Sequence, residues 1–302
     1  LHDNLKSKLD LDLHIFSGNC VAVLESINEQ LQPYEVILLT EYSTSPQDRE
    51  QNQVIENNII TTHQTWSAKV IPSSQTILDV EAITNSPKYK PPKSMKDMVR
   101  LFKLEFGDFE NIVFQTNELN PSLSSRKKGL SVNSQYQTSL NKIRPLLTTP
   151  GYFRGGENEA IARLENKVIS QHDYVNSFNK PKSISTNVKG NPFEPTTTGL
   201  SPYISTGCLS IRRLWNSCSE IQQSSEHTVP PVSLHGQILF REMFYLLSRS
   251  TANWDQDIGN SQCKEIEWGE LNQVQLDAWE SGQTGFPLID AMMRQLNATG
   301  WM

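Results

Sequence analysis

Thr284-Gly-Phe-Pro-Leu-Ile-Asp-Ala-Met-Met-Arg-Gln-Leu-Asn-Ala-Thr-Gly-Trp301 is the stretch that decides the fold of this chain. Proline is favoured in the first turn of a helix, so Pro287 marks a helix start. The apolar side chains that follow recur at helical spacing, at Leu288, Ile289, Met292, Met293 and Leu296. The pattern predicts a helix over residues 287–298 whose apolar stripe belongs to a hydrophobic core.

Three more segments precede this stretch in a fixed order. They are Thr198-Gly-Leu-Ser-Pro-Tyr203, Gly236-Gln-Ile-Leu-Phe-Arg-Glu242 and Glu265-Ile-Glu-Trp268. Apolar periodicity predicts a helix after Gly155-Gly-Glu157 and others near residues 209–221, 232–250 and 271–280. No strand signal interrupts this region, so residues 155–302 are predicted to be all-α.

Residues 1–80 alternate strand and helix signals instead. Strand-like runs at 11–16, 34–40 and 68–72 are separated by helical patterns at 21–31 and 45–59. The second helix has a clear start, with Ser45 as N-cap and Pro46 at the first helical position. Such alternation predicts a parallel sheet with helices on its faces. The fold class expected for the chain is therefore α/β followed by all-α.

Residues 81–154 are predicted to be a linker. The segments 85–93 and 121–128 are polar and broken by proline, which is typical of loops. Arg126-Lys-Lys128 is interpreted as part of a solvated loop, with a phosphate contact as the less favoured alternative.

Composition limits the functions open to the chain. A net charge of −6 and an isoelectric point near 5.6 argue against binding of nucleic acid through bulk charge, although a local basic cleft remains open. The four cysteines form no C-x-x-C pair and the six histidines no metal-ligand spacing. Neither a metal site nor a disulfide framework is indicated, and a reducing cytosol or nucleus fits. No apolar run is long enough to span a membrane.

Taken together, the four segments resemble the flavin-binding domain of the cryptochrome/photolyase family. Residues 194–203 and 230–237 look like the animal cryptochrome and (6-4) photolyase branch in particular. The resemblance implies FAD as cofactor, preceded by an α/β domain that can hold an antenna chromophore, a folate or a deazaflavin. It divides the chain into a truncated doubly wound α/β domain at 1–80, the linker at 81–154 and a partial helical FAD-binding domain at 155–302. The sequence as given is therefore expected to be cut at both ends.

The resemblance also assigns roles to individual residues. Contacts to the FAD phosphates fall to Thr198, Leu200 and Ser201, contacts to the flavin fall to Gln237 and Arg241, and Trp301 is assigned to the flavin cavity. Trp268 takes the position of the outermost electron-relay tryptophan, where an indole suits the task because it can be oxidised to a radical. Without the resemblance, the same side chains would be interpreted as a helix cap, a surface stripe and a packing residue.

Phe240 departs from the family pattern. It stands where the family usually has a tryptophan, which in DNA-repairing members packs against the extruded lesion. A phenylalanine can stack on a flipped base, but with less area and no N–H donor. The departure weakens an interpretation as a repair enzyme without excluding it.

Three functions follow as expectations. The first is a cryptochrome-like blue-light photoreceptor or circadian clock regulator, which acts on clock or signalling proteins in the nucleus and cytoplasm without being an enzyme. The second is a DNA photolyase, which repairs pyrimidine dimers in damaged DNA by electron transfer from FAD. The third is a non-functional fragment of such a protein. Phe240 and the acidic isoelectric point favour the first.

Overall fold

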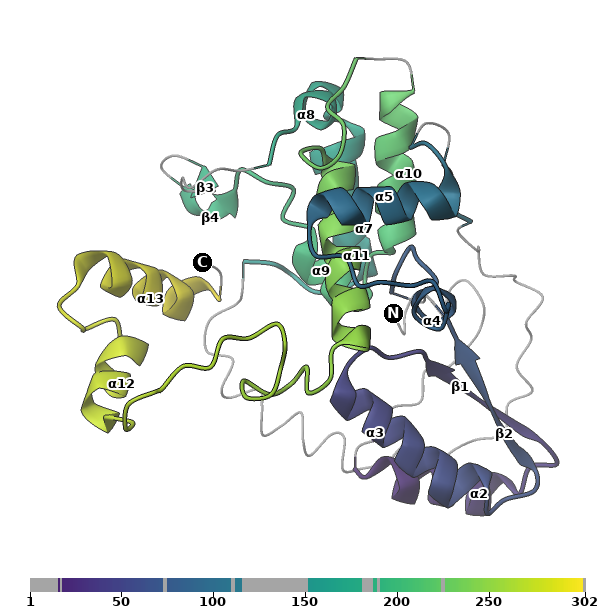
Figure 1. Ribbon diagram of the computed structural model, residues 1–302. Coiled ribbons are helices and arrows are strands. Elements are labelled where there is room, and N and C mark those ends of the chain that lie inside the picture. The colour runs from purple at the N-terminus through teal and green to yellow at the C-terminus, as the bar shows by residue number, and fades with distance from the viewer. Residues whose placement is uncertain are drawn as a thin grey trace.

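The computed structural model of the 302-residue chain describes residues 16, 18–72, 75–109, 112–115, 152–180, 187–188, 191–223 and 226–300. The strand expected at 11–16 falls outside the described residues except for Phe16, and so does Trp301. Figure 1 shows a small α/β part, a central helical body and an outlying pair of helices near the C-terminus. No helix in the described ranges is both long and apolar enough to cross a membrane.

The α/β part contains two parallel strands flanked by helices. Its elements are α2 (Cys20–Leu31), β1 (Val36–Glu41), α3 (Pro46–Ile55), the π-helical turn η1 (Glu56–Ile60) and β2 (Trp66–Ile71). Val36 pairs with Trp66 and Glu41 with Ile71, in parallel register. The predicted strand–helix–strand order is confirmed. Ser45 holds the N-cap position of α3, but its side chain makes no capping hydrogen bond.

The region expected to be a linker contains two helices, so the loop-like prediction for residues 81–154 is wrong in part. They are α4 (Val80–Thr84) and α5 (Met95–Phe106). Met98 and Phe102 of α5 are fully buried, and the Ser94 hydroxyl accepts the Asp97 N–H as a helix cap. Proline and lysine around residues 87–93 concealed this helix, because its apolar positions follow immediately on a proline-rich run.

The C-terminal part is helical, as predicted, apart from one small hairpin. Its helices are α7 (Glu157–Leu164) with the π-helical turn η3 (Glu165–Ile169), α8 (His172–Ser177), α9 (Ser201–Ser205), α10 (Ile211–Gln222), α11 (Leu234–Ser250), α12 (Gln273–Glu280) and α13 (Pro287–Thr299). The hairpin pairs β3 (Asn187–Val188) with β4 (Asn191–Pro195) in antiparallel fashion. This correction to the all-α prediction is small, because the hairpin comprises one strand of 2 residues and one of 5 residues.

Helix α11 runs through the middle of the core. Leu239 and Leu246 on α11 are fully buried, as is Trp215 on α10. The Trp215 ring lies 5.1 Å from that of Phe102, which brings α5 onto the same core. Leu200 and Tyr203 around α9 belong to this cluster too. The core therefore joins the segment at 198–203 to α11.

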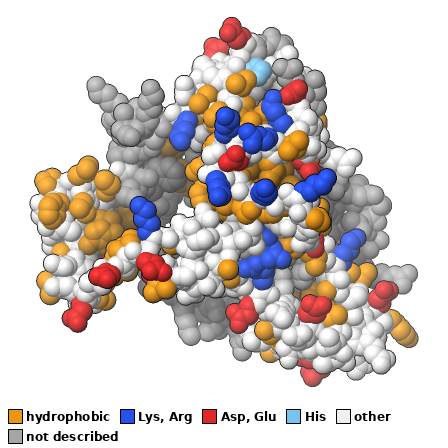
Figure 2. Space-filling view, viewed as in Figure 1, with side chains coloured by type: hydrophobic (Ala, Val, Ile, Leu, Met, Phe, Trp, Pro, Cys, Tyr) orange, Lys and Arg blue, Asp and Glu red, His pale blue; other side chains and the backbone are white. Residues whose placement is uncertain are grey.

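The apolar stripe of α13 is exposed, which contradicts the prediction that it belongs to a core. Leu288 is 70% exposed, Ile289 and Met292 are each 38% exposed, and Met293 is buried. Helix α13 packs on α12, whose 8 residues span about 12 Å against about 20 Å for the 13 residues of α13. The shorter helix cannot cover the longer stripe. Figure 2 shows the resulting apolar surface on the outlying helices.

Candidate cofactor site

The segment expected to hold the FAD phosphates forms a tight turn into α9. Gly199 adopts a left-handed conformation with φ of 60°, which glycine reaches without steric cost. Leu200 is 1% exposed and anchors the turn in the core, whereas Ser201 at the helix start is exposed. The Nε of Arg163 donates a hydrogen bond to the Thr198 carbonyl oxygen at 2.8 Å.

Arg163 belongs to a cationic cluster that the sequence interpretation missed. Its Nη2 lies 3.2 Å from the Glu194 carboxylate, and the Lys167 ammonium lies 2.5 Å from the same oxygen. The Arg163 and Glu194 side chains are only 14% and 15% exposed, so neither is free to swing into solvent. The cluster thus sets two cations against one carboxylate beside Thr198. The i, i+4 spacing of Arg163 and Lys167 after the Gly-Gly-Glu helix start was the available signal.

This cluster fits the diphosphate end of FAD. Phosphate oxygens are bound in proteins by arginine, lysine and backbone N–H groups at turns that lead into helices. The turn at 198–201 offers the hydroxyl of Ser201 and a backbone fixed by Arg163. The phosphate-binding roles of Thr198, Leu200 and Ser201 remain predictions that this arrangement suits.

The next two site residues lie on the outer side of α11. Gln237 is half-buried and Phe240 is 42% exposed. The Phe240 ring meets that of Phe244 edge-on at 5.0 Å, and the Lys180 ammonium lies 6.0 Å from its centroid. The result is an aromatic pair with a cation nearby, open to solvent, which can receive a flat partner. The contact of Phe240 with a substrate remains a prediction.

Arg241 is engaged within the protein. Its Nη1 donates to the Gln75 carbonyl oxygen at 2.7 Å, and its Nη2 donates to the Tyr245 hydroxyl at 2.9 Å. Its guanidinium also lies 4.5 Å from the centroid of the Tyr245 ring. These contacts join α11 to the segment after β2. The flavin contact expected of Arg241 remains a prediction. A flavin would have to contact the same guanidinium that already bonds Gln75 and Tyr245.

The predicted electron-relay residue lies apart from the core. Trp268 is 74% exposed in the irregular segment between α11 and α12. An exposed indole suits the outer end of a relay, which exchanges electrons with solvent, but the structure does not bring Trp268 together with Gln237 and Thr198. Its role stays a prediction, as does that of Trp301, which lies outside the described residues.

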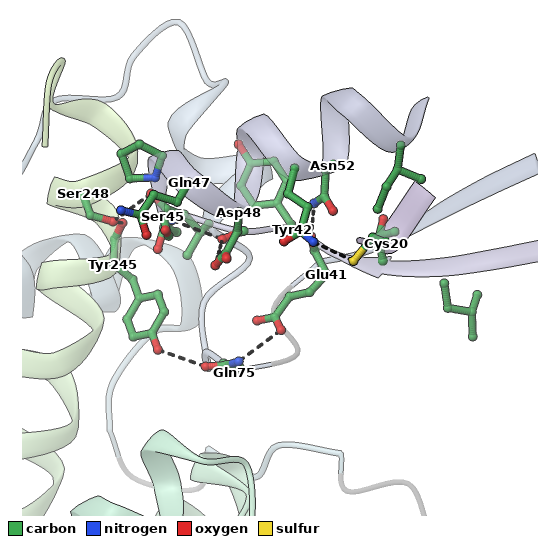
Figure 3. A pocket seen from close by; sticks show the side chains of 18 of the residues that line it. Cys20, Glu41, Tyr42, Ser45, Gln47, Asp48, Asn52, Gln75, Tyr245 and Ser248 are labelled. Carbon is green, nitrogen blue, oxygen red and sulfur yellow. Dashed lines mark hydrogen bonds between the residues drawn. The ribbon is translucent and has the colours of Figure 1, made fainter. Parts of the chain in front are cut away.

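A separate cleft of about 940 Å³ opens between the α/β part and α11 (Figure 3). It lies at the carboxyl end of β1, where ligands bind in open parallel sheets. Gln75 spans its base: its Nε2 donates to Glu41 at 3.1 Å, and its Oε1 accepts from the Tyr245 hydroxyl at 3.2 Å. Asp48 accepts from the Ser43 hydroxyl at 3.0 Å on the opposite wall. The walls are mixed: carboxylates and amides lie among apolar and aromatic side chains.

Known proteins resemble this chain along almost its whole length. Residues 233–302 match the family model described as the FAD binding domain of DNA photolyase. The chain is 34% identical over 307 residues to a (6-4)DNA photolyase of Arabidopsis thaliana, covering 99% of this chain and 52% of that protein. It is 30% identical over 312 residues to Cryptochrome-2 of Gallus gallus, covering 99% of this chain and 50% of that protein. The chain thus spans about half the length of the curated relatives it matches.

The fold agrees as well. A crystal structure of a Synechocystis cryptochrome superposes with a TM-score of 0.66 at 19% identity, covering 99% of this chain and 59% of that one. The expected α/β-then-helical fold is thereby confirmed, and FAD is confirmed as the cofactor of the domain that the family model describes. From its sequence segments, its fold and its relatives, the chain belongs to the cryptochrome/photolyase family.

Proposed function

We propose that this chain supplies the phosphate-binding and flavin-contacting residues of a FAD-dependent blue-light receptor of the cryptochrome type. The observation that carries the proposal is the cluster of Arg163, Lys167 and Glu194 that fixes the Thr198 carbonyl. The turn it fixes enters the same core as α11, which carries Gln237 and Arg241.

The chain's own residues have distinct tasks in this proposal. The turn at 198–201 receives the diphosphate, since Arg163 holds its backbone and Arg163 and Lys167 supply positive charge. Gln237 offers an amide to the polar edge of the flavin ring. Trp268, exposed to solvent, exchanges electrons with the outside. FAD, when bound, supplies light absorption and one-electron chemistry, and the protein supplies position and electrostatics.

Phe240 supports a receptor over a repair enzyme. Its ring is open to solvent, but it presents a smaller face than tryptophan to an extruded base. A receptor would act on clock or signalling proteins in the nucleus and cytoplasm. An antenna chromophore, a folate or a deazaflavin, would occupy the cleft at the end of β1.

A DNA photolyase is the second candidate. The relative from Arabidopsis thaliana named (6-4)DNA photolyase is 34% identical, against 30% for the chicken cryptochrome. In this case damaged DNA would be the substrate and Phe240 would face the lesion.

Blue-light repair assays on the chain loaded with FAD separate the two candidates. The receptor proposal predicts flavin photoreduction without loss of lesions from a DNA duplex that contains a (6-4) photoproduct. The Phe240→Trp variant serves as a comparison, because it restores the aromatic face expected of repair enzymes. Light-dependent repair by the unmodified chain would overturn the receptor proposal. Failure of the chain to bind FAD at all would overturn both.

A further inference from the structure

The carboxylate of Glu194 contacts the two cations that the proposed function assigns to the diphosphate of FAD. Glu194 belongs to strand β4 and stands four residues before Thr198. The Nη2 of Arg163 lies 3.2 Å from its Oε1, and the Nζ of Lys167 lies 2.5 Å from the same oxygen. Carboxylate and phosphate oxygens accept the same charged hydrogen bonds, so the two anions compete for one pair of cations.

A third group holds the other oxygen of this carboxylate. The hydroxyl of Tyr152 donates a hydrogen bond to the Oε2 of Glu194. Both carboxylate oxygens therefore have a donor, and the side chain is only 15% exposed. Held in this way, Glu194 satisfies Arg163 and Lys167 as a bound anion would. The chain itself thus supplies an anion for its own cationic pair.

Arg163 can exchange one anion for another without releasing the turn. Its Nε donates to the Thr198 carbonyl oxygen at 2.8 Å, whereas its Nη2 lies against Glu194. Its guanidinium also lies 5.0 Å from the centroid of the Phe153 ring, which helps to hold it in place. A Cβ on Gly199 would lie 2.4 Å from the same Nη2, so the turn passes directly beside this donor. Nη2 can therefore pass from the carboxylate to a phosphate oxygen at the turn while Nε stays bonded.

The ion pairs of Glu194 are made at a cost in hydration. Burial raises the pKa of Glu194 and lowers the pKa values of Arg163 and Lys167. Each shift favours the neutral form, so the three charges have lost water that their partners replace only in part. A diphosphate carries more negative charge and more acceptor oxygens than one carboxylate. It can therefore displace Glu194 from the two cations.

The hairpin that carries Glu194 provides the movement that this exchange needs. The side chain is too enclosed to turn away alone, so the carboxylate leaves the cations together with β4. Strand β4 has 5 residues and its partner β3 has 2, and Figure 1 shows the hairpin projecting from the helical body. A two-stranded hairpin is only marginally stable by itself. Displacement of β4 therefore costs little.

We propose that Glu194 is an internal competitor of FAD, whose carboxylate and the cofactor's diphosphate alternate on Arg163 and Lys167. The hydrogen bond from Tyr152 stabilises the closed arrangement, in which Glu194 occupies the cations. The inference rests on the function proposed above, which places the diphosphate at the turn at 198–201. The measured affinity for FAD is then reduced in proportion to the fraction of chains whose cations are open.

The test compares Glu194→Gln with the unmodified chain in fluorescence titrations with FAD and with riboflavin. Glutamine keeps the size of the side chain and one acceptor oxygen but removes the negative charge. FAD affinity should rise by about tenfold, which corresponds to cations that are open in about one unmodified chain in ten. Riboflavin carries no phosphate, so its affinity should be the same for both proteins. Inorganic diphosphate should displace FAD from the unmodified chain, because it occupies the same cations.

Tyr152→Phe tests the same contact without removing a charge. It deletes the hydroxyl that holds the second carboxylate oxygen, so Glu194 is released more easily and FAD affinity should rise severalfold. Glu159→Gln is the matched control, because it removes an equal charge at an exposed position of α7, and it should leave FAD affinity unchanged. Thermal melts check that each variant is folded, and Tyr152→Phe decides the question if Glu194→Gln is not.

The outcomes separate this inference from the function on which it rests. If folded Glu194→Gln binds FAD no more tightly than the unmodified chain, the competition is overturned while the cofactor site stands. An equal rise in affinity for riboflavin and for FAD would also overturn it, because the change would then not act through phosphate. If neither FAD nor inorganic diphosphate binds to any of these proteins, the proposed function fails, and this inference fails with it.

Discussion

The carboxylate of Glu242 on α11 accepts a hydrogen bond from the backbone N–H of Leu78 at 3.1 Å, although the two residues are 164 positions apart. The same oxygen accepts the Ile77 N–H at 2.9 Å, and the side chain is fully buried. One carboxylate thus satisfies two backbone donors of the segment that leaves the α/β part. Together with Arg241 and Gln75, it connects the two parts of the chain.

The stability of the protein should depend on pH through Glu242. Burial raises the pKa of this carboxyl to about 7, although the Leu78 N–H and Arg241 oppose the shift. The folded state then binds the proton more tightly than the unfolded state, whose pKa is near 4.5. Glu242 therefore contributes stability that is full below about pH 4.5 and is lost as pH rises to about 7, up to about 3 kcal/mol. Urea unfolding of the unmodified chain and of Glu242→Gln measures this contribution.

The free energy of unfolding of Glu242→Gln should change less between pH 4.5 and 7 than that of the unmodified chain. Glu270→Gln, at an exposed position, is the matched control and should leave the profile unchanged. Identical profiles for Glu242→Gln and the unmodified chain would contradict the prediction. Glu242→Leu should destabilise at every pH, by about 3 kcal/mol, because both N–H groups lose their acceptor.

His235 should have the opposite effect: the free energy of unfolding should fall as the pH is lowered. Burial lowers the pKa of its imidazole to about 4, from an ordinary value of 6.5. Its ring packs 4.1 Å from that of Trp215, and its Nε2 lies 3.2 Å from both the Ser219 hydroxyl and the Trp215 carbonyl. As the pH falls, His235 is protonated in the unfolded state at a higher pH than in the folded state. The stability that the neutral imidazole contributes is therefore present above pH 6.5 and is lost as the pH falls to about 4.

The variant His235→Gln, which cannot be protonated, should be less stable than the unmodified chain at pH 8. Its remaining stability should then fall less between pH 6.5 and 4. Denaturant titrations over this range test the claim. His172→Gln, at an exposed position, provides the comparison. The prediction would be refuted if His235→Gln lost more stability than the unmodified chain as the pH falls from 6.5 to 4.

Gly236 should not tolerate a side chain. A Cβ at this position would lie 2.2 Å from the Pro231 carbonyl oxygen, a backbone atom that cannot move away alone. Gly236→Ala should therefore lower the free energy of unfolding by at least about 2 kcal/mol, despite the better helix propensity of alanine. Gly269→Ala is the control, because no atom lies within 4 Å of its added Cβ. Equal melting temperatures for the two variants would show that the contact at Gly236 relaxes freely.

Arg163 should control FAD binding through the turn it holds. Arg163→Gln removes the charged hydrogen bonds to Thr198 and Glu194, so the turn at 198–201 should loosen and lose positive charge. FAD affinity, measured by fluorescence titration, should fall by about tenfold or more, since charged hydrogen bonds are worth about 1.5–3 kcal/mol. Arg154→Gln, an exposed arginine on the same stretch, should bind FAD like the unmodified chain. If Arg163→Gln bound FAD as tightly as the unmodified chain, the cluster would not be part of the cofactor site.

Local sequence was enough to predict the elements whose signals are short-range. The helix at α3 follows from its proline start, and β1 and β2 follow from β-branched and leucine-rich runs between polar turns. Helix α5 was missed because Pro91 and Pro92 precede it directly, and the loop signal prevailed over its apolar positions. The cluster at Arg163 was missed for a different reason: its partners Glu194 and Thr198 lie 31 and 35 residues away.

The sequence by itself determined the fold class, the cofactor and the family, because these depend on periodicity and on motifs that can be read along the chain. The tertiary structure alone decided how the motifs are used. Periodicity marked the stripe of α13 as apolar, but burial depends on which surface covers it, and Leu288 remains exposed. Likewise, Arg241 and Glu242 are adjacent in a recognised segment, yet their partners Gln75, Ile77 and Leu78 are fixed only when distant backbone groups meet at α11.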